Sequence, residues 1–378
     1  MAKQATNGDV TRRNFLKLAS GVAGAAVVGL PQFKEAMAQP IPFAADLSKE
    51  QLLEGYRKMQ LIRRGEIKVR ELLKSGNPPE GLRGAFHSSE GEEACCVGVA
   101  MAMRLGHDYL GHTHRSHGYP IAMGVDIGAW MAELMGRETG TNKGHGGSMH
   151  IADPSKGMLG AISIIAQGYP HAVGAAYSAK VRGTDQVAIG TLGDGASNQG
   201  AFHESINIAT IWELPAVFIV HNNGWRINVP ARWENAPVKR GKDLSVRAAA
   251  FGIPGITVDG NDMWAVYKAA KYAIDNTRAG KGPYLLELVT YRHRAHGNTV
   301  GEHEVLSWPH NDRAEYEYWM RRDPITRFES TVLSGGDLTQ DELDGVVANV
   351  DAAIEEAVQF AVDSPFENPE ECFADVLY

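Results

Sequence analysis

Apolar side chains recur at helical spacing near the start of the folded region, which we expect to begin at residue 48. Ser48-Lys-Glu-Gln51 has the form of a capping box, in which Ser and Gln side chains bond to backbone N–H groups at a helix start. The apolar positions that follow are Leu52, Leu53, Tyr56, Met59 and Ile62. Gly76-Asn77-Pro78-Pro79 should end this helix, and a second helix is predicted from near Ser89 to Met103.

The middle of the chain alternates short apolar runs with helical patterns. The runs predict strands at Val187–Leu192, Ala216–Val220, Ile256–Val258 and Tyr284–Tyr291, and the helical patterns cover Phe202–Trp212 and Met263–Ala279. Strands that alternate with helices are joined by right-handed crossovers into a parallel sheet. We therefore expect an α/β fold, with a doubly wound, mostly parallel sheet flanked by helices. An acidic helix and an irregular terminus should follow from about Leu338.

Polar residues follow two of the predicted strands. Gly193-Asp194-Gly195-Ala196 ends the first strand, and Asn223 comes directly after the second. If these strands are neighbours, the Asp194 carboxylate and the Asn223 amide oxygen meet at one sheet edge, and both are ligands that Mg²⁺ accepts. The small residues Gly195 and Ala196 let a phosphate approach the backbone at a helix start. The pattern predicts a metal-bridged diphosphate, with an ordinary Gly-Asp-Gly turn as the alternative.

The first 38 residues have the form of a twin-arginine export signal. Thr11-Arg-Arg-Asn-Phe-Leu-Lys17 precedes an apolar run from Leu18 to Leu30, and Ala36-Met37-Ala38 offers a cleavage site. Residues 39–47 are predicted to be a linker, and residues 48–378 a single domain. We expect export to the periplasm without a stable membrane anchor, because the apolar run is too short to span a bilayer comfortably. The alternative is an accidental Arg-Arg pair on a cytoplasmic protein.

Composition narrows the choice of partners. The chain is 44% hydrophobic and 22% charged, as is ordinary for a globular protein, and its formal net charge is −8. A negative balance argues against nucleic acid as a partner. The three cysteines, Cys95, Cys96 and Cys372, lack the spacing of a zinc site or a disulfide framework, so we interpret them as small buried apolar residues.

Several motifs together resemble one enzyme family. They are Gly91-Glu-Glu-Ala-Cys-Cys-Val-Gly98, His114-Arg-Ser-His-Gly118, Gly144-His-Gly-Gly-Ser-Met-His150, the Asp194 to Asn223 segment, and Thr290-Tyr-Arg292 with His296. This order of motifs is similar to that in the alpha subunits of two-chain 2-oxo acid dehydrogenase first components, which act on pyruvate, branched-chain 2-oxo acids or acetoin. The resemblance extends from about residue 46 to the C-terminus and implies a thiamine-diphosphate-binding fold.

The resemblance implies roles for individual residues. Asp194, Asn223 and the backbone of Trp225 would bind Mg²⁺. His87 and His296 would face the reacting centre. The remaining contacts to thiamine diphosphate would come from His114, Arg115, Ile165, Gly193, Gly195, Ala196, Arg292 and again His296. The alternatives are a surface histidine at 87, a salt bridge at Arg115 and a plain basic loop at 292–296, while His117 could line the pocket or lie in the core.

The chain also departs from the family pattern. His221 stands where the family usually has Glu, Trp225 and His114 where it has Tyr, and Ser163 where it has Gly. Gly297 occupies the position of a regulatory serine in mitochondrial members, so that phosphorylation is not expected. These differences weaken any inference about the substrate.

The resemblance implies that the chain works with a partner. A glutamate that activates the cofactor lies on the beta subunit in two-chain members, so we expect an alpha-two beta-two assembly that is inactive without it. The acyl or aldehyde unit would pass to an acceptor such as the lipoyl arm of an acyltransferase. The alternatives are a carbon–carbon lyase or carboligase of the same fold, uncoupled from lipoyl transfer, and a non-catalytic cofactor-binding protein.

Overall fold

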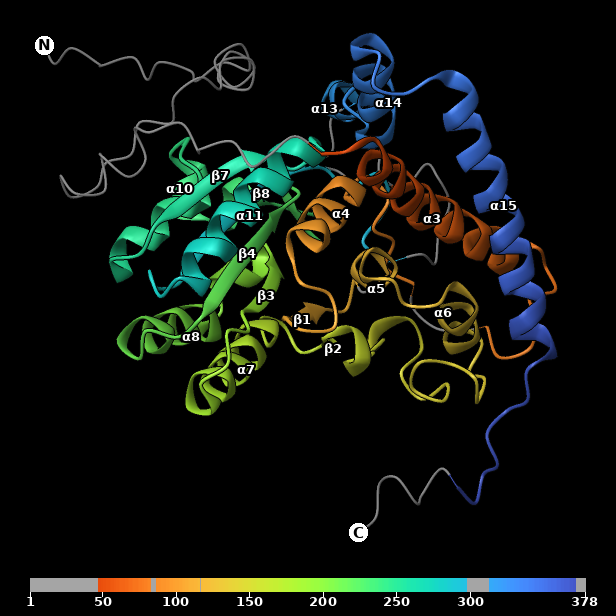
Figure 1. Ribbon diagram of the computed structural model, residues 1–378, viewed down its shortest axis with the longest axis horizontal. Helices are drawn as coiled ribbons and strands as arrows, with labels where there is room; N and C mark the ends of the chain where they lie inside the picture. Colours follow the sequence, from red (N-terminus) through yellow and green to blue (C-terminus); the bar gives the residue numbers. More distant parts are fainter. Residues whose placement is uncertain (1–46, 83–85, 116, 298–312, 372–378) are drawn as a thin grey trace, which may run out of the picture.

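A six-stranded parallel sheet forms the centre of the protein. The computed structural model describes residues 47–82, 86–115, 117–297 and 313–371, so the expected signal and nearly all of the linker lie outside the described residues. The strand order is β2-β1-β3-β4-β8-β7 (Figure 1). The strands are β1 (Tyr109–Thr113), β2 (Met158–Ile162), β3 (Ala188–Gly193), β4 (Ala216–Asn222), β7 (Gly255–Asp259) and β8 (Tyr284–Val289). The four predicted strands are confirmed, and β1 and β2 extend the sheet.

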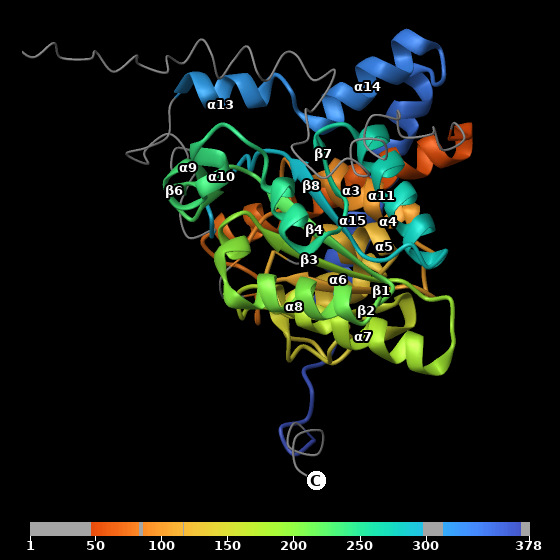
Figure 2. The same ribbon diagram turned by 90° about the vertical axis from the view of Figure 1, so that its left-hand side faces the viewer.

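Apolar side chains cover both faces of the sheet. Along β3, Ala188 and Leu192 point into a cluster with helices α7 (Gly168–Arg182) and α8 (Gly200–Ile211). Ile189 points the other way, into a larger cluster that includes α4 (Glu93–Ala102), α5 (Gly118–Met123) and α11 (Met263–Arg278). Figures 1 and 2 show the two helical layers with the sheet between them. The doubly wound fold expected from the sequence is confirmed, and burial on both faces explains why its strands are continuous apolar runs.

Long helices close the larger cluster. Helix α3 (Lys49–Lys74) begins at the predicted capping box, with the side chains of Ser48 and Gln51 bonded reciprocally to backbone N–H groups. It packs against α15 (Gln340–Asp363), which also contacts α6 (Ile127–Leu134) (Figure 1). Among the described residues, no helix is long and apolar enough to cross a membrane.

Helix α4 starts later than the sequence suggests. It begins at Glu93 rather than near Ser89, because Gly91 has a φ of +96°, a conformation that ends helical geometry and favours glycine. A side chain here would also collide with the Tyr291 carbonyl, since a Cβ on this residue would lie 2.3 Å from that oxygen. The segment before α4 is therefore held tightly against the segment after β8.

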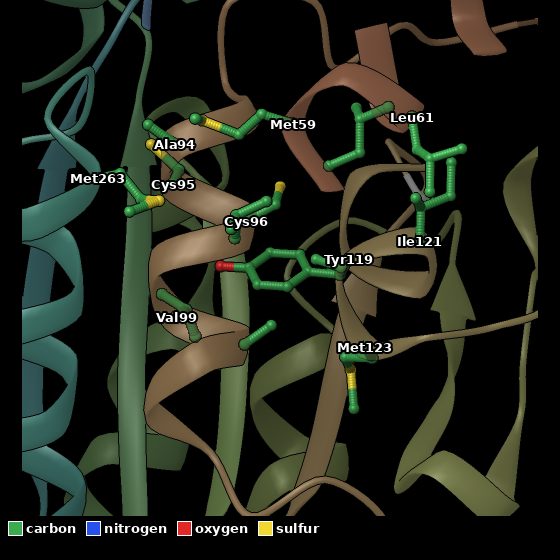
Figure 3. Close-up of a cluster of buried hydrophobic side chains, with 14 of the residues drawn as sticks. Met59, Leu61, Ala94, Cys95, Cys96, Val99, Tyr119, Ile121, Met123 and Met263 are labelled. Carbon is green, nitrogen blue, oxygen red and sulfur yellow. The ribbon is translucent and has the colours of Figure 1, made fainter. Parts of the chain in front are cut away.

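Cys95 and Cys96 lie on α4 inside the apolar core, as interpreted from the sequence. Figure 3 shows them between Met59, Tyr119 and Met263. Both are buried and unbridged, and burial raises the pKa of each thiol well above its ordinary value. Cys372 lies outside the described residues.

Short elements complete the part of the chain that the structure describes. A small antiparallel hairpin, β5 (Trp225–Arg226) and β6 (Val229–Pro230), follows β4. The other elements are α9 (Ala231–Glu234), α10 (Ala236–Lys239), α13 (Arg313–Met320), α14 (Pro324–Gly335) and the 3-10 helices η1 (Gly147–Met149), η2 (Pro154–Lys156), η3 (Gly195–Asn198) and η4 (Leu244–Phe251).

Candidate active site

Asp194 and Asn223 lie together at the carboxyl edge of the sheet. Strands β3 and β4 are adjacent and parallel, and Gly193 pairs with His221 in their register. The Asp194 backbone N–H donates to the His221 carbonyl at 3.1 Å. The two strands are therefore neighbours, which is the condition that the predicted metal site requires.

The Asp194 carboxylate is buried without a full set of partners. The residue is 2% exposed, and its Oδ2 atom has no hydrogen-bond partner among the described residues. Burial and the nearby Glu234 raise the pKa of the Asp194 carboxyl to about 7. A buried anionic oxygen without a partner is costly, and a bound cation would offset that cost.

The Asn223 amide is held at both ends. Its Nδ2 donates to Glu92 Oε1 at 2.8 Å, and its Oδ1 accepts from the Trp225 backbone N–H at 3.2 Å. Glu92 also accepts from His221 Nδ1 at 3.2 Å. Burial alone would raise the pKa of Glu92, but the bonds from His221 and Asn223 and the charge of Arg115 lower it to about 2. Glu92 belongs to the motif Gly91–Gly98, whose sequence alone assigns it no role.

Two guanidinium groups are buried beside this edge. Arg115, on the loop after β1, donates to the Ser88 carbonyl and to the His296 carbonyl, the latter at 3.3 Å. Arg292 follows β8 and donates to the Ile227 carbonyl at 2.9 Å. Burial lowers the pKa of Arg115, and burial together with Arg115 lowers that of Arg292 to about 9. Two crowded cations of this kind favour an anion between them.

Three imidazoles line the same region. Nitrogen atoms of His87, His114 and His296 all lie within 4.8 Å of one another, and their rings meet edge to face. Burial and the neighbouring Arg115 lower the pKa of His87 to about 3, of His114 to about 4 and of His296 to about 2. The rings are therefore neutral near pH 7. A metal between them would face the two guanidinium groups, so the arrangement fits an anion better than a second cation.

The small residues after β3 lie beside the carboxylate. Gly195 begins η3 and is covered by Arg226, whose side-chain carbons would lie 2.6 Å from a Cβ at this position. Gly193 ends β3, and Ala196 lies in η3. Gly195 is thus required by the close approach of Arg226.

Ile165 and His117 differ in their exposure to solvent. Ile165 is on the loop after β2, and its side chain is 46% exposed. His117 is fully buried, with Nδ1 3.1 Å from Glu66 and Nε2 2.9 Å from Ser148. Of the two possibilities that the sequence left open for His117, the core histidine describes this position.

The chemistry of this edge fits a diphosphate and a divalent cation. It combines hard oxygen ligands at Asp194 and Asn223, an unpartnered carboxylate oxygen, and the guanidinium groups of Arg115 and Arg292. Divalent cations of the Mg²⁺ type take carboxylate, amide and backbone oxygens, and phosphate oxygens complete their coordination. The residues present therefore fit a diphosphate group held through Mg²⁺.

Comparison with known proteins is consistent with this site. Residues 57–370 match the family model described as "Dehydrogenase E1 component". The chain is 42% identical to the alpha subunit of acetoin:2,6-dichlorophenolindophenol oxidoreductase of Bacillus subtilis over 330 residues, 87% of this chain and 94% of that protein. It is also 42% identical to the protein of the same name from Cupriavidus necator over 335 residues, 88% of this chain and 96% of that one. The pyruvate dehydrogenase E1 component subunit alpha of Rhizobium meliloti is 37% identical over 336 residues, 88% of this chain and 92% of that protein.

The family match covers every strand of the sheet and each residue of the candidate site. The relatives align over nearly their whole lengths, so the similarity is not confined to the motif around Asp194. This chain belongs to the dehydrogenase E1 component family, as a subunit of the alpha type.

Proposed function

We propose that this chain is the alpha subunit of a thiamine-diphosphate- and Mg²⁺-dependent dehydrogenase that cleaves acetoin or decarboxylates a pyruvate-like 2-oxo acid. The observation that carries the proposal is the buried, partly unpartnered carboxylate of Asp194 beside two buried guanidinium groups. The family uses thiamine diphosphate, and its members are oxidoreductases. Acetoin is the first substrate to test, because both relatives at 42% identity are named for it.

Mg²⁺ would be held by this chain alone. Asp194 would supply a carboxylate oxygen, Asn223 its Oδ1 and Trp225 its backbone carbonyl. Trp225 is acceptable there because a carbonyl is common to every residue. The diphosphate would complete the shell and would be neutralised by Arg115 and Arg292.

The imidazoles would act as neutral hydrogen-bonding groups. His114 and His296 would contact phosphate oxygens as donors, and His87 would face the substrate. His87 Nδ1 has no hydrogen-bond partner among the described residues, so it can bond to a bound molecule. A neutral imidazole near pH 7 can donate or accept a proton without first losing a charge. Ile165 would contact the cofactor's aminopyrimidine ring as an apolar wedge, and Gly193, Gly195 and Ala196 would lie along the diphosphate.

Thiamine diphosphate supplies, when bound, the nucleophilic carbon that attacks the substrate carbonyl. The protein's own task is to hold the cofactor, to orient the substrate and to keep water from the reacting carbonyl. His87 and His296 would orient the substrate oxygen, and the buried arginines would fix the cofactor's charged end.

The homologous alpha subunits imply a beta partner. Large apolar side chains are exposed at the carboxyl edge of the sheet, where a partner would cover them: Ile164, Ile165, Ile227 and Trp233 are 67%, 46%, 50% and 55% exposed. We propose an alpha-two beta-two assembly, with the activating glutamate on the beta chain. The acyl or aldehyde unit would pass to an acceptor such as a lipoyl arm. The named relatives do not favour an uncoupled lyase or carboligase, or a non-catalytic binding protein.

Cofactor titration of the co-expressed alpha and beta chains tests the proposal. Asp194→Asn removes the charged metal ligand and should weaken Mg²⁺-dependent binding of thiamine diphosphate by more than about tenfold, as even outer-shell changes at metal sites do. Asp275→Asn, on an exposed ion pair of α11, is the control and should bind normally. Unchanged cofactor binding by Asp194→Asn would contradict the proposal.

Turnover measurements test the substrate and the partner. With an artificial electron acceptor, the two-chain enzyme should oxidise acetoin or a 2-oxo acid, and the isolated alpha chain should not. Family-like turnover by the isolated chain would disprove the need for a beta subunit.

We also propose export by the twin-arginine route. The support is the ordered sequence of Arg12-Arg13, the apolar run and the Ala-Met-Ala site, all outside the described residues. A fractionation blot should find the mature chain in the periplasm, and Arg12→Lys with Arg13→Lys should retain the precursor in the cytoplasm. Equal distribution of both forms would refute export by this route.

A further inference from the structure

Four buried polar side chains form a connected row behind the proposed cation site. Glu92 comes from the turn before α4, Tyr119 from α5 and His221 from β4, and Asn223 directly follows β4. Tyr119 Oη lies 2.8 Å from His221 Nε2, and His221 Nδ1 lies 3.2 Å from Glu92 Oε2. Asn223 Nδ2 lies 2.8 Å from Glu92 Oε1. None of the four residues is more than 7% exposed, so these polar groups must bond to one another rather than to bulk water.

The chemistry of the row fixes which end of the Asn223 amide faces the cation site. An asparagine amide donates from nitrogen and accepts at oxygen, whereas an ionised carboxylate only accepts. Glu92 can therefore face only the Nδ2 end of Asn223. Its Oδ1 must then point to the opposite side, toward the Trp225 backbone N–H and the proposed metal.

The next residue in the row holds Glu92 itself. His221 Nδ1 faces a carboxylate oxygen, so this nitrogen carries a proton and donates. His221 Nε2 then bonds to the Tyr119 hydroxyl, which can act as donor or acceptor. Each atom of the row has a complementary partner, and the row ends in the Asn223 oxygen.

We propose that Glu92 and His221 are positioning residues that orient the Asn223 oxygen for binding of Mg²⁺. The inference rests on the proposed function, since it requires Asn223 to be a metal ligand. Hydrogen bonds behind a metal ligand fix its orientation and commonly change metal affinity when they are lost.

The same geometry predicts which side chains are compatible at positions 92 and 221. The native pair places a carboxylate acceptor opposite an imidazole donor. The single change His221→Glu instead places two carboxylates opposite each other. Combining it with Glu92→Gln would restore complementarity with the direction reversed. The new amide nitrogen would then donate to the new carboxylate, while the amide oxygen accepts from Asn223.

The test measures the Mg²⁺ concentration for half-maximal binding of thiamine diphosphate, in full-length alpha chain co-expressed with its beta chain. Glu92→Ala and His221→Glu should each raise that concentration by about 10- to 100-fold. The double variant Glu92→Gln/His221→Glu should return to within about threefold of wild type. Glu204→Gln, on the exposed face of α8, is the control and should not change it.

The outcomes separate this inference from the proposed function. If Asp194→Asn loses Mg²⁺-dependent binding while Glu92→Ala keeps it unchanged, the positioning role is wrong and the proposed function stands. If both variants bind like wild type, the proposed function itself fails. If Glu92→Ala does not fold, the double variant Glu92→Gln/His221→Glu decides. Recovery of the wild-type Mg²⁺ requirement supports the inference. A requirement raised by the product of the two single effects overturns it. Thermal unfolding of the cofactor-free proteins checks that the change in Mg²⁺ requirement does not follow from lower stability.

Discussion

His112 lies on β1 with both ring nitrogens hydrogen bonded, and its replacement by glutamine gives a measurable change in pH-dependent stability. Nε2 donates to the Arg115 carbonyl at 2.6 Å, so Nδ1 accepts from the Thr191 hydroxyl, also at 2.6 Å. The residue is 4% exposed. Burial and the nearby His221 lower the pKa of His112 from an ordinary 6.5 to about 3. The folded protein therefore holds this ring neutral.

The sign of the effect follows from proton binding. Below pH 6.5 the unfolded chain protonates His112, whereas the folded chain does so only near pH 3. The stability from the neutral ring is complete above pH 6.5 and is lost as the pH falls between these values. At about pH 5 the loss is 1.36 kcal/mol for each of about 1.5 pH units, or about 2 kcal/mol. For a domain of this length that equals about 3 °C in Tm.

Glutamine at position 112 can donate to the Arg115 carbonyl and accept from Thr191 without titrating. Urea unfolding at about pH 8 and about pH 5 should show that wild type loses about 2 kcal/mol more than His112→Gln between the two conditions. The exposed His171→Gln is the control and should lose as much as wild type. Equal losses in wild type and His112→Gln would refute the reasoning that burial keeps this ring neutral.

Two further predictions concern local packing and a partly buried ion pair. Gly91→Ala should destabilise the protein and weaken cofactor binding, because its Cβ would lie 2.3 Å from the Tyr291 carbonyl and push the segment that carries Arg292 outward. Gly76→Ala is the control, since Gly76 also has a positive φ but a Cβ there would meet no atom within 4 Å. Equal effects of the two changes on cofactor affinity would contradict this reasoning. Asp108→Ala should lower the free energy of unfolding by about 3 kcal/mol in urea titrations, because it removes two hydrogen bonds of 2.9 and 2.8 Å to the partly buried Arg278 and the acceptors of the Arg104 and Val187 backbone N–H groups. A loss below about 1 kcal/mol, as for an exposed pair, would show that the pair is solvated.

Local patterns in the sequence predicted most of the sheet and several helices. The apolar runs that became β3, β4, β7 and β8 are short and continuous because both faces of each strand are buried. The capping box at Ser48 is a local interaction, and the structure confirms it. The start of α4 was misplaced because the positive φ of Gly91 is set by its contact with Tyr291, a residue far away in the sequence.

Strands β1 and β2 were not predicted. Both contain glycine, Gly111 in β1 and Gly160 in β2, and Gly160 has a φ of +115°. Glycine weakens a strand pattern, and here it meets tertiary needs, since a Cβ at Gly111 would lie 2.7 Å from the Gly168 carbonyl of α7. The local sequence around Gly111 does not predict this close contact with Gly168.

The candidate site also depends partly on the sequence and partly on the tertiary structure. The sequence by itself determined which groups are available: Asp194 and Asn223 at the ends of predicted strands, Arg292 after the last predicted strand, and Arg115 within a motif that resembles the family. Their chemical types and spacing are properties of the chain. Tertiary structure alone decided that β3 and β4 are neighbours and that His87, His114 and His296 meet.

The partnership of Glu92 with His221 and Asn223 likewise exists only in the fold. These residues are 129 and 131 positions apart from Glu92, and no local pattern joins them. The sequence showed His221 only as a departure from a family pattern. The fold explains why His221 bonds to Glu92: burial removes water as a partner, so each polar atom needs a complementary atom from another element.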